Sequence, residues 1–189
     1  MFNSFSNKQF VTKQQVVEYA RRKISNLPVY LDTETTGLEK TDEIIELAIV
    51  NSSGEVIFES FVRPQKPIPA SATAINHISN DMVADSPSWA DIWPEVRVLL
   101  QGHPIGMYNA EFDIRMILQS HEINKLPNNA KLNAFDIMKV YSDYMRSDRR
   151  YRLEQAGRNL GIVIPNSHRA ADDTLLTRAV FHSIAGVPY

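Results

Sequence analysis

The stretch Leu31-Asp32-Thr33-Glu34-Thr35-Thr36-Gly37-Leu38 decides the fold of this chain. An apolar run precedes Asp32, which predicts a buried strand over residues 29–33. Side chains two residues apart lie on one face of a strand, so Asp32 and Glu34 repel each other unless cations lie between them. The Thr-Thr-Gly that follows allows the backbone to turn closely past a ligand. A bare Asp-x-Glu is best explained as a solvated strand end, but these flanks favour a functional site.

A second acidic site lies in Tyr108-Asn109-Ala110-Glu111-Phe112-Asp113. A predicted strand leads through Asn109 and Ala110 into a predicted helix, which puts Asp113 in the first helical turn. The helix dipole favours a carboxylate there. Taken alone, Asp113 is better explained as an acid at a helix start.

The third site is His168-Arg169-Ala170-Ala171-Asp172-Asp173-Thr174, at the start of the last predicted helix. His168 is expected in the loop before the helix and Asp173 in its first turns. A lone histidine at a helix start is more often surface decoration than a base, and Asp172 and Asp173 could be mere dipole partners. Either aspartate could be the functional one on these grounds.

The three sites indicate more together than each does alone, because each lies at the end of a different predicted element. Four carboxylates that converge in one fold are unstable without divalent metal. Hard oxygen ligands in a chain without cysteine favour Mg²⁺ or Mn²⁺.

The remaining pattern predicts an α/β fold with one mixed sheet flanked by helices. Asn51-Ser52-Ser53-Gly54 is typical of a hairpin, and three prolines between residues 64 and 69 indicate a loop leaving the sheet. A capping box at Thr12 and Gln15 begins the first helix. Strands are predicted at 29–33, 43–50, 56–62, 105–108 and 134–138, and helices at 12–24, 88–100, 110–120, 151–160 and 170–184.

Composition narrows the classes of function. A length of 189 residues fits one domain with at most a small appendage, and we predict an N-terminal helical extension at 1–27 and a main domain at 28–189. No apolar run is long enough to cross a bilayer and the first ten residues do not resemble a secretory signal, so a cytoplasmic location is expected. The net charge of −2 lacks the basic excess of tight DNA binders. Any nucleic acid must be gripped locally or through metal ions.

Arginines that interleave with Tyr144 and Tyr151 form a candidate local binding site for nucleic acid. Arginine and tyrosine together can hold phosphates and stack on unpaired bases, although a solvated loop flank is the stronger interpretation of this run. The arginines are Arg146, Arg149, Arg150 and Arg152.

The three sites resemble the three motifs of the DEDDh (DnaQ-like) 3′→5′ exonucleases, which include the epsilon subunit of bacterial DNA polymerase III. Asp-Thr-Glu-Thr-Thr-Gly matches the first motif, Asn-Ala-x-Phe-Asp the second and His-x-Ala-x-x-Asp the third. Their order and spacing agree from about residue 29 to residue 184. The resemblance implies a ribonuclease H-like fold, with a mixed five-stranded sheet of three antiparallel strands followed by parallel additions.

The resemblance also implies roles for residues. Asp32, Glu34, Asp113 and Asp173 would be catalytic metal ligands for two Mg²⁺ or Mn²⁺ ions, and His168 the general base. The spacing of the third motif selects Asp173 over Asp172. Substrate contacts are implied at Thr35, Gly37, Leu38, Ile75, Tyr108 and Asn109. Asn76 and His77 depart from the His-Gly of relatives, so detailed substrate contacts are not carried over to that loop.

The implied reaction is hydrolysis of terminal phosphodiester bonds of DNA, with single-stranded ends preferred, to nucleoside 5′-monophosphates. An RNA-trimming exoribonuclease of the same family and a catalytically silent nucleic-acid-binding module are the alternatives. The partners expected are DNA or RNA 3′ ends and no membrane. A polymerase, attached through the N-terminal helix, is a further candidate partner, and so is a second copy of the chain.

Overall fold

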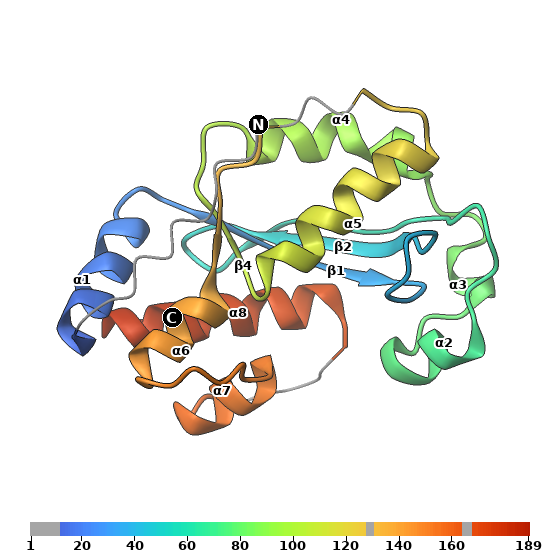
Figure 1. Cartoon of the computed structure of the whole chain (residues 1–189). Coiled ribbons are helices and arrows are strands. Elements are labelled where there is room, and N and C mark those ends of the chain that lie inside the picture. Colours follow the sequence, from blue (N-terminus) through green and yellow to red (C-terminus); the bar gives the residue numbers. More distant parts are fainter. Residues whose placement is uncertain (1–11, 128–130, 164–167) are drawn as a thin grey trace.

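The fold is built on one five-stranded sheet with the strand order β3-β2-β1-β4-β5 (Figure 1). β1, β2 and β3 pair antiparallel, whereas β4 and β5 add in parallel, as the sequence predicts. The computed structural model describes residues 12–127, 131–163 and 168–189. The strands are β1 Val29–Thr35, β2 Ile44–Val50, β3 Val56–Phe61, β4 Ile105–Met107 and β5 Ala134–Asp136.

Helices cover both faces of the sheet (Figure 1). One face packs against α1, α6 and α8, and the other against α4 and α5. The helices are α1 Lys13–Ile24, α2 Ala70–Asn76, α3 Asn80–Val83, α4 Trp89–Leu100, α5 Ala110–Ile123, α6 Ile137–Tyr144, α7 Leu153–Asn159 and α8 Ala170–Ala185. Within the described residues, none of these helices is long and apolar enough to cross a membrane.

The central strand β1 alternates between the two cores. Tyr30 packs with α8 and Leu31 packs with the helices of the opposite face. This alternation directs Asp32 and Glu34 toward the α8 side of the sheet and Thr33 toward the α5 side. β1 therefore continues as a strand through the acidic stretch to Thr35, two residues beyond the predicted end.

The N-terminal helix α1 begins with the predicted capping box, because the Thr12 hydroxyl accepts from the Gln15 amide and the Gln15 side chain accepts from the Thr12 amide. Val16 and Ala20 are buried in the same core cluster as α8. The Arg21 Nε donates to the Ala185 carbonyl at 2.8 Å. The boundary at residues 27 and 28 stays a prediction.

Besides the longer β1, the structure differs from the predicted elements in two places. The predicted strand over 134–138 ends at Asp136, because the Asp136 side chain accepts from the Met138 and Lys139 amides and so begins α6. The segment after the three prolines contains two short helices, α2 and α3, which were not predicted. The predicted helix over 88–100 is confirmed with Pro94 inside it.

Candidate active site

The first acidic motif lies on β1, where it faces the start of α8. Glu34 pairs in register with Glu46 of β2, so two carboxylates lie on neighbouring strands. Burial, followed by the carboxylates of Asp173, Glu46 and Asp113, raises the pKa of Glu34 to about 8. Burial, followed by the carboxylates of Asp113, Asp173, Glu34 and Glu46, raises the pKa of Asp32 well above its ordinary value. Without a cation between them, these crowded carboxyls therefore hold their protons more readily than free acids do.

The second motif enters the site from the opposite side of β1. Asn109 precedes α5 in the left-handed conformation, with φ 67°, and its amide donates to Asp136 Oδ1 at 3.2 Å. This turn points Asp113, which is only 2% exposed, back toward the sheet. The Thr33 hydroxyl donates to Asp113 Oδ1 at 2.8 Å. Burial raises the pKa of Asp113 to about 7, against the lowering effect of the bond from Thr33.

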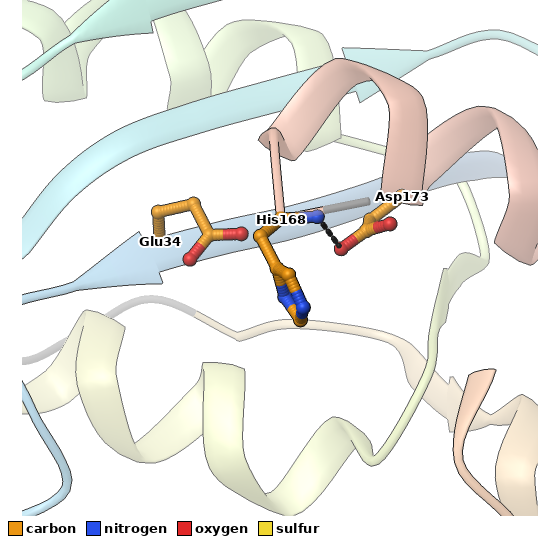
Figure 2. A group of neighbouring side chains, drawn as sticks. All are labelled: Glu34, His168 and Asp173. Atoms are coloured by element: carbon orange, nitrogen blue, oxygen red, sulfur yellow. Dashed lines mark hydrogen bonds between the residues drawn. The ribbon is translucent and has the colours of Figure 1, made fainter. Parts of the chain in front are cut away.

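The third motif begins α8. The His168 amide donates to Asp173 Oδ2 at 3.2 Å, and His168 itself has φ 66°. Ligand atoms of Glu34, His168 and Asp173 all lie within 4.8 Å of one another (Figure 2). Burial raises the pKa of Asp173 to about 6, and its Oδ1 is buried without a hydrogen-bond partner. The structure thus brings the first and third motifs together.

A partly buried ion pair, which was not predicted from the sequence, holds the third motif on the sheet. Glu46 is 1% exposed and receives the Arg169 Nη2 at 2.6 Å and the Ala170 amide at 3.0 Å. Arg169 follows His168 directly, so this pair fixes the start of α8 against β2. The available signal was the single charged residue in the apolar run 44–50.

A second contact missed from the sequence joins α7 to the predicted base. Glu154 Oε1 lies 3.5 Å from His168 Nε2, and the Glu154 side chain is 26% exposed. A carboxylate at this distance can orient the imidazole ring.

The predicted substrate-contacting residues differ in exposure: two are exposed, two are buried, and Gly37 and Asn109 lie between. Leu38 and Ile75 are 72% and 59% exposed, which is unusual for large apolar side chains. Thr35 is buried, and its hydroxyl donates to the Gly37 carbonyl at 2.8 Å. Tyr108 is 9% exposed and donates its hydroxyl to the Tyr151 carbonyl at 2.9 Å.

Hydrogen bonds from side chains of α5 hold the loop that carries Leu38. Arg115 donates to the Leu38 carbonyl at 3.1 Å, and Gln119 donates to the carbonyls of Glu39 and Asp42. Asp42 in turn accepts from the Thr36 hydroxyl at 2.9 Å. The exposed leucine is therefore presented on an ordered backbone.

The loop that carries Ile75 is joined to the same strand end. Asn76 is 2% exposed and donates from Nδ2 to the Thr35 carbonyl at 3.2 Å. Because Ile75 precedes this anchor, both exposed apolar side chains are held relative to the end of β1.

A mixed sheet of this order, with carboxylates gathered where its central strand meets the last helix, defines a ribonuclease H-like nuclease scaffold. The family model described as exonuclease, of the ribonuclease T type, matches residues 29–181. The chain belongs to this exonuclease family, as the sequence motifs predict.

Individual relatives agree with the family. The chain is 30% identical over 187 residues to an exonuclease of Escherichia phage 186, covering 93% of this chain and 96% of that protein. It is 32% identical over 163 residues to a DNA polymerase III subunit epsilon-like protein of Rhodobacter capsulatus, covering 81% of this chain but only 23% of that protein.

Solved structures agree as well. Exonuclease X, solved in complex with 5′ overhanging duplex DNA, is similar with a TM-score of 0.66 and 26% identity. That match covers 84% of this chain and 90% of the exonuclease X chain.

Proposed function

We propose that this exonuclease removes nucleotides from the 3′ ends of DNA, prefers single-stranded ends, depends on two divalent cations and releases nucleoside 5′-monophosphates. The observation that carries the proposal is the group formed by Glu34, His168 and Asp173, whose ligand atoms lie within 4.8 Å of one another. It combines an imidazole with two carboxylates that come from different elements, β1 and α8. Exonuclease X with bound DNA and the epsilon-like relatives support DNA as the polymer.

The donor set fits Mg²⁺ or Mn²⁺. Asp32, Glu34, Asp113 and Asp173 supply hard oxygen atoms, and burial raises the pKa of each. The buried Asp173 Oδ1 lacks any partner in the described chain, as expected of an atom that awaits a ligand. When bound, the cations would neutralise these carboxylates and polarise the scissile phosphate.

His168 is the proposed general base. Its ring would take a proton from the attacking water while the bond between phosphorus and the 3′ oxygen of the preceding nucleotide breaks. The backbone bond from His168 to Asp173 and the contact with Glu154 hold the residue and its ring in place. The products are a nucleoside 5′-monophosphate and a shortened chain with a free 3′ hydroxyl.

Leu38 and Ile75 are proposed to hold the terminal base between them, since both are exposed and apolar. Thr35, Gly37 and Asn109 would lie along the path by which the strand end reaches the site. They would offer it backbone and small polar groups. Tyr108 is proposed to support the substrate site from beneath its surface. Its hydroxyl donates to the Tyr151 carbonyl, and little of its ring is exposed. A polymerase partner stays a prediction.

The test is a gel assay with the full chain, Mg²⁺ or Mn²⁺, and matched DNA and RNA oligonucleotides labelled at either end. DNA labelled at the 5′ end should give a ladder that shortens by single nucleotides, whereas a 3′ label should appear at once as mononucleotide. His168→Ala should lose a factor of about 10²–10⁴ in rate and still bind DNA. His103→Ala is the matched control, because His103 precedes β4 at the opposite end of that strand from Asn109.

Three results would overturn the proposal. They are release of internal fragments, hydrolysis unaffected by a chelator, and full activity of His168→Ala. Faster hydrolysis of RNA than of DNA would instead assign the chain to RNA trimming.

A further inference from the structure

A basic loop joins α6 to α7, and we call residues 145–152 the arginine loop. It contains four arginines whose side chains are all exposed. Within the described residues, none of the four forms an ion pair with an acidic side chain. They are Arg146, Arg149, Arg150 and Arg152.

The charge of this segment is opposite to that of the rest of the chain. Residues 145–152 hold four arginines against one aspartate, whereas the remaining residues hold 16 basic and 21 acidic side chains. A polyanion bound by this protein is therefore attracted to this segment and repelled elsewhere.

The C-terminal end of the arginine loop is joined to the candidate active site by two contacts. At its end, the Tyr151 carbonyl accepts from the Tyr108 hydroxyl, which places it at the carboxyl end of β4. Two residues beyond the loop, Glu154 contacts His168 at 3.5 Å. Because consecutive Cα atoms are about 3.8 Å apart, Arg150 and Arg152 lie directly beside these anchors. In Figure 1 the segment between α6 and α7 runs along the same side of the sheet as α8.

The loop backbone is held in one shape by its own hydrogen bonds. The Ser142 hydroxyl donates to the Arg149 carbonyl at 2.7 Å, and the Arg149 amide donates to the Ser147 hydroxyl at 3.2 Å. Arg146 adopts a left-handed conformation with φ 53°. The arginines thus project from an ordered turn, which lowers the entropy lost when they bind.

The side chains of the arginine loop are suited to binding phosphates. The Tyr144 ring is covered by the Lys13 ammonium at 3.9 Å, and the Tyr151 ring packs edge-on against Tyr141 at 5.2 Å. Each ring thus already has a neighbour within the protein, whereas the four guanidinium groups extend from exposed residues. Guanidinium groups hold phosphates without reading base identity.

We propose that the arginine loop binds the phosphates of the single strand that leads into the active site. The inference rests on the proposed function for the position of the strand's end. It predicts that the loop contributes to the binding of long strands and not to the chemical step.

The experiment compares Arg149→Gln/Arg150→Gln with the control Arg22→Gln/Arg97→Gln, which removes the same charge from exposed sites on α1 and α4. Binding of a labelled DNA oligonucleotide of about 16 nucleotides is measured in Ca²⁺ across a salt series, with its length checked afterwards. Hydrolysis of the same oligonucleotide and of a dinucleotide is measured in Mg²⁺.

The loop variant should reduce the slope of log affinity against log salt by about 1.4, since each phosphate contact contributes about 0.7 on a single strand. Its KM for the long strand should rise about tenfold, with kcat and the KM for the dinucleotide within about twofold. An unchanged salt slope, or an equal loss in the control variant, would overturn the inference. If the wild type binds but hydrolyses nothing, the proposed function fails and the binding comparison still tests the loop.

Discussion

From the cluster of carboxylates we predict a change in the free energy of unfolding, which can be measured without any assay of activity. Asp113 is 2% exposed, and burial raises its pKa from 3.8 to about 7. Asp113→Asn removes the ionisable group but keeps an oxygen that can accept from the Thr33 hydroxyl. In the absence of divalent metal, this variant should be more stable than the wild type at neutral pH.

The sign and size follow from proton linkage. As pH rises above 3.8, the unfolded chain releases the Asp113 proton and the folded chain does not, so the free energy of unfolding falls until about pH 7. A shift of about three units corresponds to about 4 kcal/mol. The substitution also removes the charge that, after burial, contributes most to the raised pKa of Asp32.

The assay is denaturant unfolding in EDTA, followed by the fluorescence of Trp89 and Trp93, both buried on α4. The stability difference between variant and wild type should be near zero at about pH 4 and reach about 4 kcal/mol at about pH 8. Asp85→Asn, at an exposed position, is the control. A difference that stays constant with pH, or a wild type that gains stability relative to the variant as pH rises, would refute the reasoning.

Two further substitutions test how the site is held. Glu46→Gln should lower stability by about 2–3 kcal/mol and slow turnover, because it leaves Arg169 without its carboxylate; equal stability and turnover would contradict this. Gly37→Ala should cost about 1–3 kcal/mol and raise KM more than it lowers kcat, since the new Cβ would lie 2.5 Å from Asp42 Oδ2. Urea unfolding and steady-state kinetics measure both, and an unchanged KM would show that the loop accommodates the methyl group.

The sheet could be predicted from the sequence because each strand begins with apolar residues and turn residues separate the early strands. The apolar run 44–50 and the Asn51–Gly54 turn determine β2 and the hairpin to β3 without help from the rest of the chain. α6 was missed because its start depends on the Asp136 side chain capping two amides, in a stretch whose residues also suit a strand. α2 was missed because a segment rich in proline resembles a loop.

The candidate site was predictable only as a set of motifs. Asp113 alone resembles an ordinary acid at a helix start, and Asp172 and Asp173 could not be told apart by local arguments. The structure separates these two aspartates by the contact from the His168 amide, which goes to Asp173. Glu46 was overlooked because its partner, Arg169, lies 123 residues away in the sequence.

The sequence by itself determined the strands, the family and the identity of the acidic side chains, because apolar periodicity and short motifs are local properties of the chain. Only the tertiary structure decided which of these groups meet and how much each is desolvated. The raised pKa values of Glu34, Asp113 and Asp173 have burial as their first cause, and burial depends on what the other elements bring to the same place.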